Sequence, residues 1–191
     1  MNQTVTYQIE VNDFEDGSTK YEEINPREVV LKIAYVNAAD SKKNDNEYIE
    51  PPAVQLLMKN GCLNCHTSRG KLIGPSFERI AERYQPKSET IEALIRRIKT
   101  GTSGNWGDVI MPSNPGVDQK ELEKILDWVL QQKPGAQEYV LFGTSGQITF
   151  VGQSKSIPEN GKYYLTASYL DHGPGAQQRG TSEIVLYQSE R

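Results

Sequence analysis

The chain has 191 residues, enough for one or two domains with a buried core. Hydrophobic residues make up 36% and charged residues 24%, as in an ordinary globular protein, and no apolar run reaches the length of a transmembrane segment. The net charge is −4, and no basic stripe with interleaved aromatic residues is present, which argues against a nucleic-acid-binding protein.

Charge is distributed unevenly along the chain. Residues 51–133 contain 12 Lys+Arg and 9 Asp+Glu, a net charge of +3, whereas the remainder contains 9 and 16, a net charge of −7. This division predicts two structural units with different surfaces.

The N-terminal segment has two strand patterns. Residues 4–11 alternate apolar and polar side chains, and residues 28–37 form a second, more apolar run. Residues 38–50 are polar and charged without periodicity, which predicts a linker. No secretory leader opens the chain, so we expect a mature form or an excised part of a longer protein.

A turn between these two strands has an acidic cluster of Asp13, Glu15 and Asp16. Such carboxylates could bind calcium, but residues 12–18 hold only fragments of a calcium-binding loop. We therefore favour a solvated acidic turn over a calcium site.

Helical periodicity begins abruptly after Pro51-Pro52. Gly61 is expected to stop the first helix, while Ser76, Ser88 and Asp118 are expected to cap the next three. The four predicted helices are 53–60, 77–84, 88–99 and 119–132.

Strand patterns return after Pro134-Gly135, which ends the helical segment. They cover residues 139–142, 147–151, 162–169 and 183–188. Because two and four strands each make a poor sandwich alone, we expect residues 1–50 and 134–191 to form one small Ig-like β-sandwich. The all-α unit, residues 51–133, would be inserted in it or flanked by it. The predicted fold is thus a multi-domain chain of α and β units.

The chemistry of the chain centres on Cys62-Leu63-Asn64-Cys65-His66. A C-x-x-C-H spacing predicts covalent attachment of one c-type haem, with Cys62 and Cys65 forming thioethers and His66 binding the iron. The alternatives are a redox dithiol, half of a zinc site and a structural disulfide. The only other histidine, His172, is distant in sequence and is interpreted as a turn residue, and the βαβ setting of a thioredoxin-like dithiol is absent.

Electron transfer requires a sixth iron ligand, for which Met111 is the best candidate. It lies in a loop between two predicted helices, 45 residues after His66, and such a loop can cover the distal face of the haem. Met58 precedes the attachment site on the helix that leads into it, so we assign it to core packing. The distal loop has no histidine or arginine, which argues against a haem enzyme or gas sensor.

The helical segment resembles the small monohaem class I cytochromes c of bacteria over residues 52–133. Beyond the attachment site, the motifs that carry this resemblance are Ile73-Gly74-Pro75, Gly104-Asn105-Trp106-Gly107, Met111-Pro112-Ser113-Asn114 and Trp128-Val129-Leu130. The resemblance implies that the Pro75 carbonyl accepts the imidazole Nδ1–H, that Trp106 donates to a haem propionate and that Asn114 reaches the ligand sulfur. By itself, Trp106 would more often be a core residue. Trp128 is assigned to the contact between the first and last helices.

The flanking β segments carry a second, shorter resemblance. Glu15-Asp16-Gly17-Ser18 and residues 164–169 look like segments beside cytochrome modules in large secreted bacterial proteins, which often include a quinone-dependent sugar dehydrogenase domain. This implies an electron-transfer module, not itself an enzyme, that accepts electrons from such a domain or partner in the periplasm or outside the cell. The alternative is that the β unit binds a carbohydrate or protein through its tyrosines and the cytochrome is an accessory. We favour sheet packing for these tyrosines, which are Tyr139, Tyr163, Tyr164, Tyr169 and Tyr187.

Overall fold

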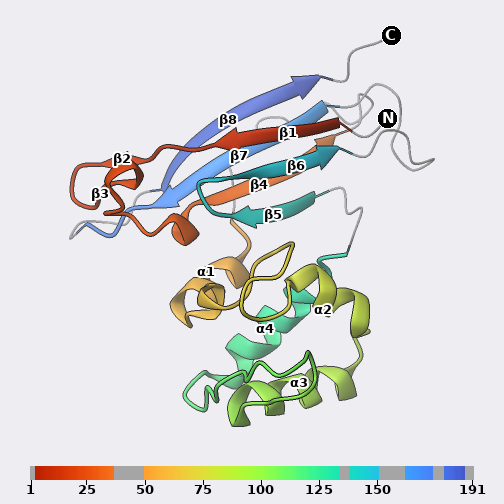
Figure 1. The fold of residues 1–191 in the computed structure, drawn as a ribbon. Coiled ribbons are helices and arrows are strands. Elements are labelled where there is room, and N and C mark those ends of the chain that lie inside the picture. The colour runs from red at the N-terminus through yellow and green to blue at the C-terminus, as the bar shows by residue number, and fades with distance from the viewer. Residues whose placement is uncertain (1–2, 37–49, 134–137, 151–161, 174–178, 188–191) are drawn as a thin grey trace. The chain divides into compact units, whose positions relative to one another are not determined.

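A computed structural model describes residues 3–36, 50–133, 138–150, 162–173 and 179–187 (Figure 1). The chain separates into two compact units, one from residues 1–49 and 137–191 and the other from residues 50–136. Almost all of the predicted linker, and the Pro134-Gly135 end of the helical segment, lie outside the described residues.

The first unit has a four-stranded antiparallel sheet in the order β5-β4-β7-β8. Its strands are β4 (Val30–Val36), β5 (Glu138–Phe142), β7 (Lys162–Leu170) and β8 (Arg179–Tyr187). The β4 strand lies between β5 and β7, with Ile33 opposite Tyr139 on one side and opposite Leu165 on the other. Strands from before and after the helical segment therefore pair in one sheet, as expected from the strand count.

A second ladder in this unit pairs β1 (Gln3–Gln8) with β6 (Ser145–Phe150) (Figure 1). Ile148 of β6 packs in one core cluster with Leu31, Ile33 and Leu165 of the larger sheet. Each such aliphatic side chain contributes about 1.5–3 kcal/mol when fully buried. Tyr139 and Tyr163 pack against the same cluster, which supports packing as the role of these tyrosines; the Tyr187 side chain lies outside the described set.

The segment between β1 and β4 departs from the predicted pattern. The strand predicted for residues 4–11 ends at Gln8, and a minimal hairpin follows, with β2 (Asn12–Asp13) paired to β3 (Gly17–Ser18). Two 3-10 turns follow it, η1 (Thr19–Tyr21) and η2 (Pro26–Glu28). The second begins because Asn25 accepts a hydrogen bond from the Arg27 amide and Pro26 fixes φ, so the next strand starts only at Val30.

The second unit contains helices α1 (Pro52–Lys59), α2 (Phe77–Arg83), α3 (Ser88–Thr100) and α4 (Gln119–Val129). Two predicted caps are confirmed: Ser76 accepts from the Arg79 amide, and Asp118 accepts from the amides of Lys120 and Glu121. The Ser88 cap is wrong. Ser88 is already the first helical residue, and the N-cap is Lys87, without a side-chain hydrogen bond.

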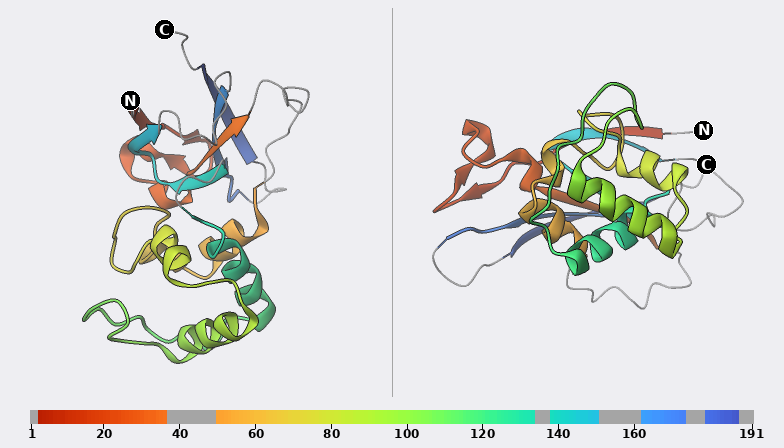
Figure 2. Two further views of the ribbon diagram at one scale, coloured as in Figure 1. Left: turned by 90° about the vertical axis from the view of Figure 1, so that its right-hand side faces the viewer. Right: turned by 90° about the horizontal axis from the view of Figure 1, so that it is seen from below.

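Helix α4 is the packing centre of this unit. Its apolar face meets α3 in a buried cluster of Ile95, Leu122 and Leu126, and Figure 2 shows the two helices side by side. Helix α1 packs on α4 as well, where Glu121 accepts from the Asn60 side-chain Nδ2 at 3.2 Å and pairs with Lys59. No helix in the described ranges is both long and apolar enough to cross a membrane.

Candidate functional site

The two cysteines and His66 lie on one tight turn directly after α1. Gly61 adopts φ +66°, which ends α1 and starts the 3-10 turn η4 (Cys62–Asn64). The Cys62 carbonyl then accepts from the amides of Cys65 at 3.3 Å and His66 at 3.0 Å. Leu63 is buried and anchors the turn in the core, while both cysteines are half-buried free thiols.

The His66 imidazole is held in one orientation by the carbonyl of Pro75. Nδ1 lies 2.7 Å from that oxygen, and since a carbonyl can only accept, Nδ1 carries the proton and Nε2 is left with its lone pair. Burial lowers the pKa of His66 despite the opposing effect of the Pro75 hydrogen bond. The ring is thus kept neutral with an unprotonated Nε2, the form of histidine that binds a metal.

Gly74 makes this position of the ring possible. A Cβ at Gly74 would lie 2.6 Å from Cε1 and 3.0 Å from Nδ1 of His66, so only glycine leaves room for the imidazole. The Gly74 amide also donates to the Cys65 carbonyl at 2.8 Å, which closes the loop back onto the attachment turn. Gly74 is part of a motif quoted above, but no sequence pattern indicated that it makes room for the imidazole.

Aromatic packing also supports the imidazole. The Phe77 ring stacks on His66 at a centroid distance of 5.9 Å and an interplanar angle of 19°. Trp128 of α4 meets Phe77 edge-on, also at 5.9 Å. Trp128 is half-buried, and the ring contact described for it is with the start of α2; its predicted contact with the first helix stays a prediction.

These residues fit a covalently attached haem c. Burial raises the pKa of the Cys62 thiol to about 11, so both the thiol and the neutral imidazole are uncharged at pH 7. Such attachment requires two thiols that are not in a disulfide, at the right spacing, and a histidine Nε2 free to bind the iron. The space for the imidazole, which a Cβ at Gly74 would obstruct, keeps that Nε2 in place.

Met111 lies in the loop between α3 and α4, and its backbone is fixed by a two-residue antiparallel bridge. The Thr102 amide donates to the Met111 carbonyl at 3.0 Å, and the Met111 amide donates to the Thr102 carbonyl at 2.9 Å. Gly101, at φ +78°, permits this close approach, because a Cβ there would lie 3.0 Å from the Met111 carbonyl oxygen. The Met111 side chain is half-buried.

Asn114 and Trp106 lie in the same loop. Asn114 donates its amide N–H to the Ile98 carbonyl at 2.9 Å and its side-chain N–H to the Pro112 carbonyl at 3.0 Å, next to Met111. Trp106 is half-buried beneath the guanidinium of Arg83, which comes from α2. The loop itself has no arginine, but the fold brings one to it, which sequence reasoning missed.

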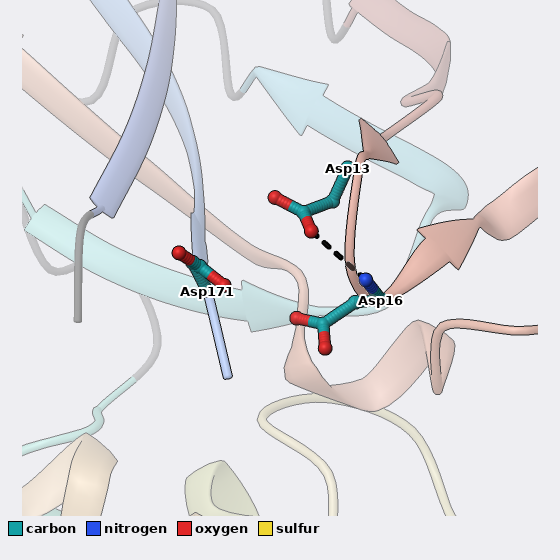
Figure 3. Close-up of side chains that lie close together, drawn as sticks. All are labelled: Asp13, Asp16 and Asp171. Atoms are coloured by element: carbon teal, nitrogen blue, oxygen red, sulfur yellow. Dashed lines mark hydrogen bonds between the residues drawn. The ribbon is translucent and has the colours of Figure 1, made fainter. Parts of the chain in front are cut away.

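The acidic turn of the first unit gathers Asp13, Asp16 and Asp171, not Glu15 (Figure 3). One oxygen from each lies within 4.8 Å of the others. Asp13 Oδ1 accepts from the amides of Glu15 and Asp16, both at 2.9 Å. Asp171 Oδ1 accepts from the Gly173 amide. These bonds give the half-buried carboxylates structural roles within the turn, and the choice between a solvated turn and a calcium site stays a prediction.

His172 joins this turn to the end of β7. Its amide donates to Asp16 Oδ2 at 2.9 Å, and the Tyr169 hydroxyl donates to the same oxygen at 2.6 Å. The Tyr169 bond and the His172 amide hold the pKa of Asp16 below its usual value. His172 lies just after β7, outside a helix or strand, and its Nδ1 is also 3.8 Å from Glu28; its role as a turn residue stays a prediction.

Comparison with known proteins identifies relatives of the helical unit. The family model "Cytochrome c" matches residues 52–133. Cytochrome c-551 of Azotobacter vinelandii is 39% identical over 79 residues, or 41% of this chain and 95% of that protein, and cytochrome c-552 of Nitrosomonas europaea is 37% identical over 78 residues, or 41% and 76%. The crystal structure of the Nitrosomonas europaea cytochrome c552 matches 41% of this chain and 98% of its own, with 37% identity and a TM-score of 0.39.

Proposed function

This chain belongs to the cytochrome c family through residues 52–133, and from that premise we propose that its helical unit transfers single electrons through one haem c bound by His66 and Met111. The observation that carries the proposal is the 2.7 Å contact between His66 Nδ1 and the Pro75 carbonyl. It fixes the tautomer, directs Nε2 to act as ligand and raises the basicity of the imidazole. The haem supplies the one-electron ferrous–ferric couple.

On the distal side, the Thr102–Met111 bridge supports Met111 as the sixth ligand. A bridge at the base of the loop restricts where the thioether can move, so little reorganisation is needed between oxidation states. A thioether favours the electron-rich ferrous state and so raises the potential. Pro75, Trp106 and Asn114 are proposed as the further haem-contacting residues.

The electron-exchange surface is proposed to be apolar with a positive surround. Ile73, next to Gly74, is 52% exposed, and Ile110, next to Met111, is 70% exposed. Both adjoin positions assigned to the haem site, in a segment whose net charge is +3. Such a surface suits brief encounters with an acidic partner, because small contacts separate quickly after electron transfer.

We further propose the setting in which this module works. Residues 1–50 and 134–191 are assigned to one Ig-like β-sandwich domain, and residues 51–133 to a cytochrome domain inserted in it. The pairing of β4 with β5 and β7 supports this division. A dehydrogenase domain or partner, of the sugar-oxidising type suggested by the flanking segments, would be the electron donor. A location outside the cytoplasm follows from where covalent haem is normally attached.

Two measurements test the function. After acid–acetone extraction the haem should stay with the polypeptide, and the ferrous protein should not bind carbon monoxide at neutral pH, because Met111 holds the sixth position. Rapid carbon monoxide binding would instead indicate a sensor or an enzyme with an open site.

The charge of the exchange surface can be tested with small oxidants. Added salt should slow oxidation by ferricyanide and accelerate oxidation by a tris-phenanthroline cobalt cation, because the local charge is positive although the whole chain is at −4. The opposite salt dependence would place electron exchange on an acidic surface.

A further inference from the structure

Trp106 is held by a stack of side chains that comes from outside its own loop. The Arg83 guanidinium lies over the indole with its carbon 4.6 Å from the ring centroid, and Tyr84 meets the same indole edge-on at 6.2 Å. Arg83 Nη1 also donates to the carbonyl of Asn105. The end of α2 is thereby attached to the loop at two adjacent residues.

A second arginine fixes the far side of this stack. Arg97 of α3 donates from Nη1 to the Tyr84 hydroxyl at 2.9 Å, and its guanidinium carbon lies 5.8 Å from the centre of that ring. The contacts form one cluster, in which Arg97 lies over Tyr84 and Arg83 lies over the rings of both Trp106 and Tyr84, at 4.6 and 5.7 Å. It spans two helices and the loop, so the indole plane is set by the fold and not by the loop alone.

Arginine is the residue type that this position requires. Arg83 is exposed, and ordering an exposed long side chain costs rotamer entropy that must be offset by its contacts. A planar guanidinium can stack on an aromatic face and donate a charge-assisted hydrogen bond at the same time, whereas an ammonium group cannot do both in this geometry.

The attachment at Asn105 extends to the base of the loop. Asn105 Nδ2 donates to Thr102 Oγ1 at 2.6 Å, and Thr102 forms the backbone bridge to Met111. A constraint applied at Asn105 and Trp106 thus acts on the same short segment that carries the assigned sixth ligand.

We propose that Arg83 is a positioning residue: it orients the Trp106 indole N–H toward an anionic acceptor and holds a positive charge beside that acceptor. This inference rests on the proposed function, in which the acceptor is a carboxylate of the bound haem. Arg83 itself contributes the stack, the hydrogen bond to Asn105 and the charge. The indole N–H is fixed as a result.

Charge and orientation can be separated with two variants of the holoprotein. Arg83→Gln removes both, and Arg83→Lys keeps the charge but loses the planar stack. Arg79→Gln is the control, because Arg79 is an exposed cation of the same helix whose ion pair among the described residues is with Glu82, one turn away at 3.1 Å. The two readouts are hydrogen exchange of the Trp106 indole N–H in the ferrous protein, with the Trp128 indole as internal reference, and the reduction potential.

Exchange at Trp106 should be about three- to tenfold faster in both Arg83 variants, in line with the strength of a cation–aromatic contact and one hydrogen bond. The potential should fall only in Arg83→Gln, because removing a nearby positive charge favours the ferric state. Arg79→Gln should match the wild type in both readouts. Unchanged exchange in the Arg83 variants, or an equal acceleration at Trp128, would overturn the proposal. Failure of the proposed function is distinguishable, because it would show in the wild type as carbon monoxide binding or extractable haem.

Discussion

Replacing Gly74 with alanine should displace His66, because the added methyl group occupies the space of the imidazole. The new Cβ would lie 2.6 Å from Cε1, 3.0 Å from Nδ1 and 3.2 Å from Nε2 of His66, all closer than side-chain atoms normally approach a Cβ. Gly74 is not among the glycines with positive φ, so the effect is a steric one and not backbone strain. Moving the ring away from the new Cβ is expected to disturb its 2.7 Å contact with the Pro75 carbonyl.

The expected cost combines overpacking with a weakened hydrogen bond. Overpacking typically costs about 1–3 kcal/mol and a lost hydrogen bond about 1 kcal/mol, so the free energy of unfolding of the holoprotein should fall by about 2–4 kcal/mol. Denaturant titration followed in the haem absorption band measures this loss. The exchange rate of the His66 Nδ1–H, followed by NMR, measures the hydrogen bond directly and should rise.

Gly116→Ala is the matched control. Gly116 also lacks a positive φ, and a Cβ there would have no heavy atom within 4 Å, so its stability should stay within about 0.5 kcal/mol of the wild type. If Gly74→Ala unfolds like this control and keeps the slow Nδ1–H exchange, the steric argument for Gly74 is wrong.

Three other outcomes are expected. Met111→Ala should abolish the weak near-infrared sulfur-to-iron band of the ferric protein and lower the potential, whereas Met58→Ala should leave both in place; the reverse pattern would reassign the ligand. Expressed alone with haem-attachment machinery, residues 52–133 should fold and bind haem, whereas residues 138–191 should show no cooperative thermal transition, because they lack β4, the strand that pairs with both β5 and β7. Asp16→Asn should destabilise the β unit at pH 7. Hydrogen bonding lowers the folded pKa of Asp16, so its contribution to the free energy of unfolding is fully present above its unfolded pKa of about 4 and is lost as pH falls through the folded pKa. The unfolding midpoints of variant and wild type should therefore differ at neutral pH and converge in acid.

The local chemistry of the helical unit could be predicted from the sequence because each signal is contained within a few residues. The C-x-x-C-H spacing fits on one turn whatever surrounds it, and the Ser76 and Asp118 caps need only their own amide neighbours. The predicted N-cap at Ser88 was wrong by one position, since the observed N-cap is Lys87. An error of one residue is within the ordinary uncertainty of a helix end.

Contacts between residues distant in the sequence were decided by the tertiary structure. Arg83 and Trp106 are 23 positions apart and carry no joint pattern, so their stack exists only because α2 ends beside the loop. The Gly74 requirement likewise comes from the position of an imidazole eight residues earlier. In the β unit, alternation of apolar and polar residues indicated strands but not their partners: β4 pairs with β5 and β7 across more than a hundred residues. Backbone hydrogen bonds are the same for almost every residue type, so only the burial of the apolar faces selects the register.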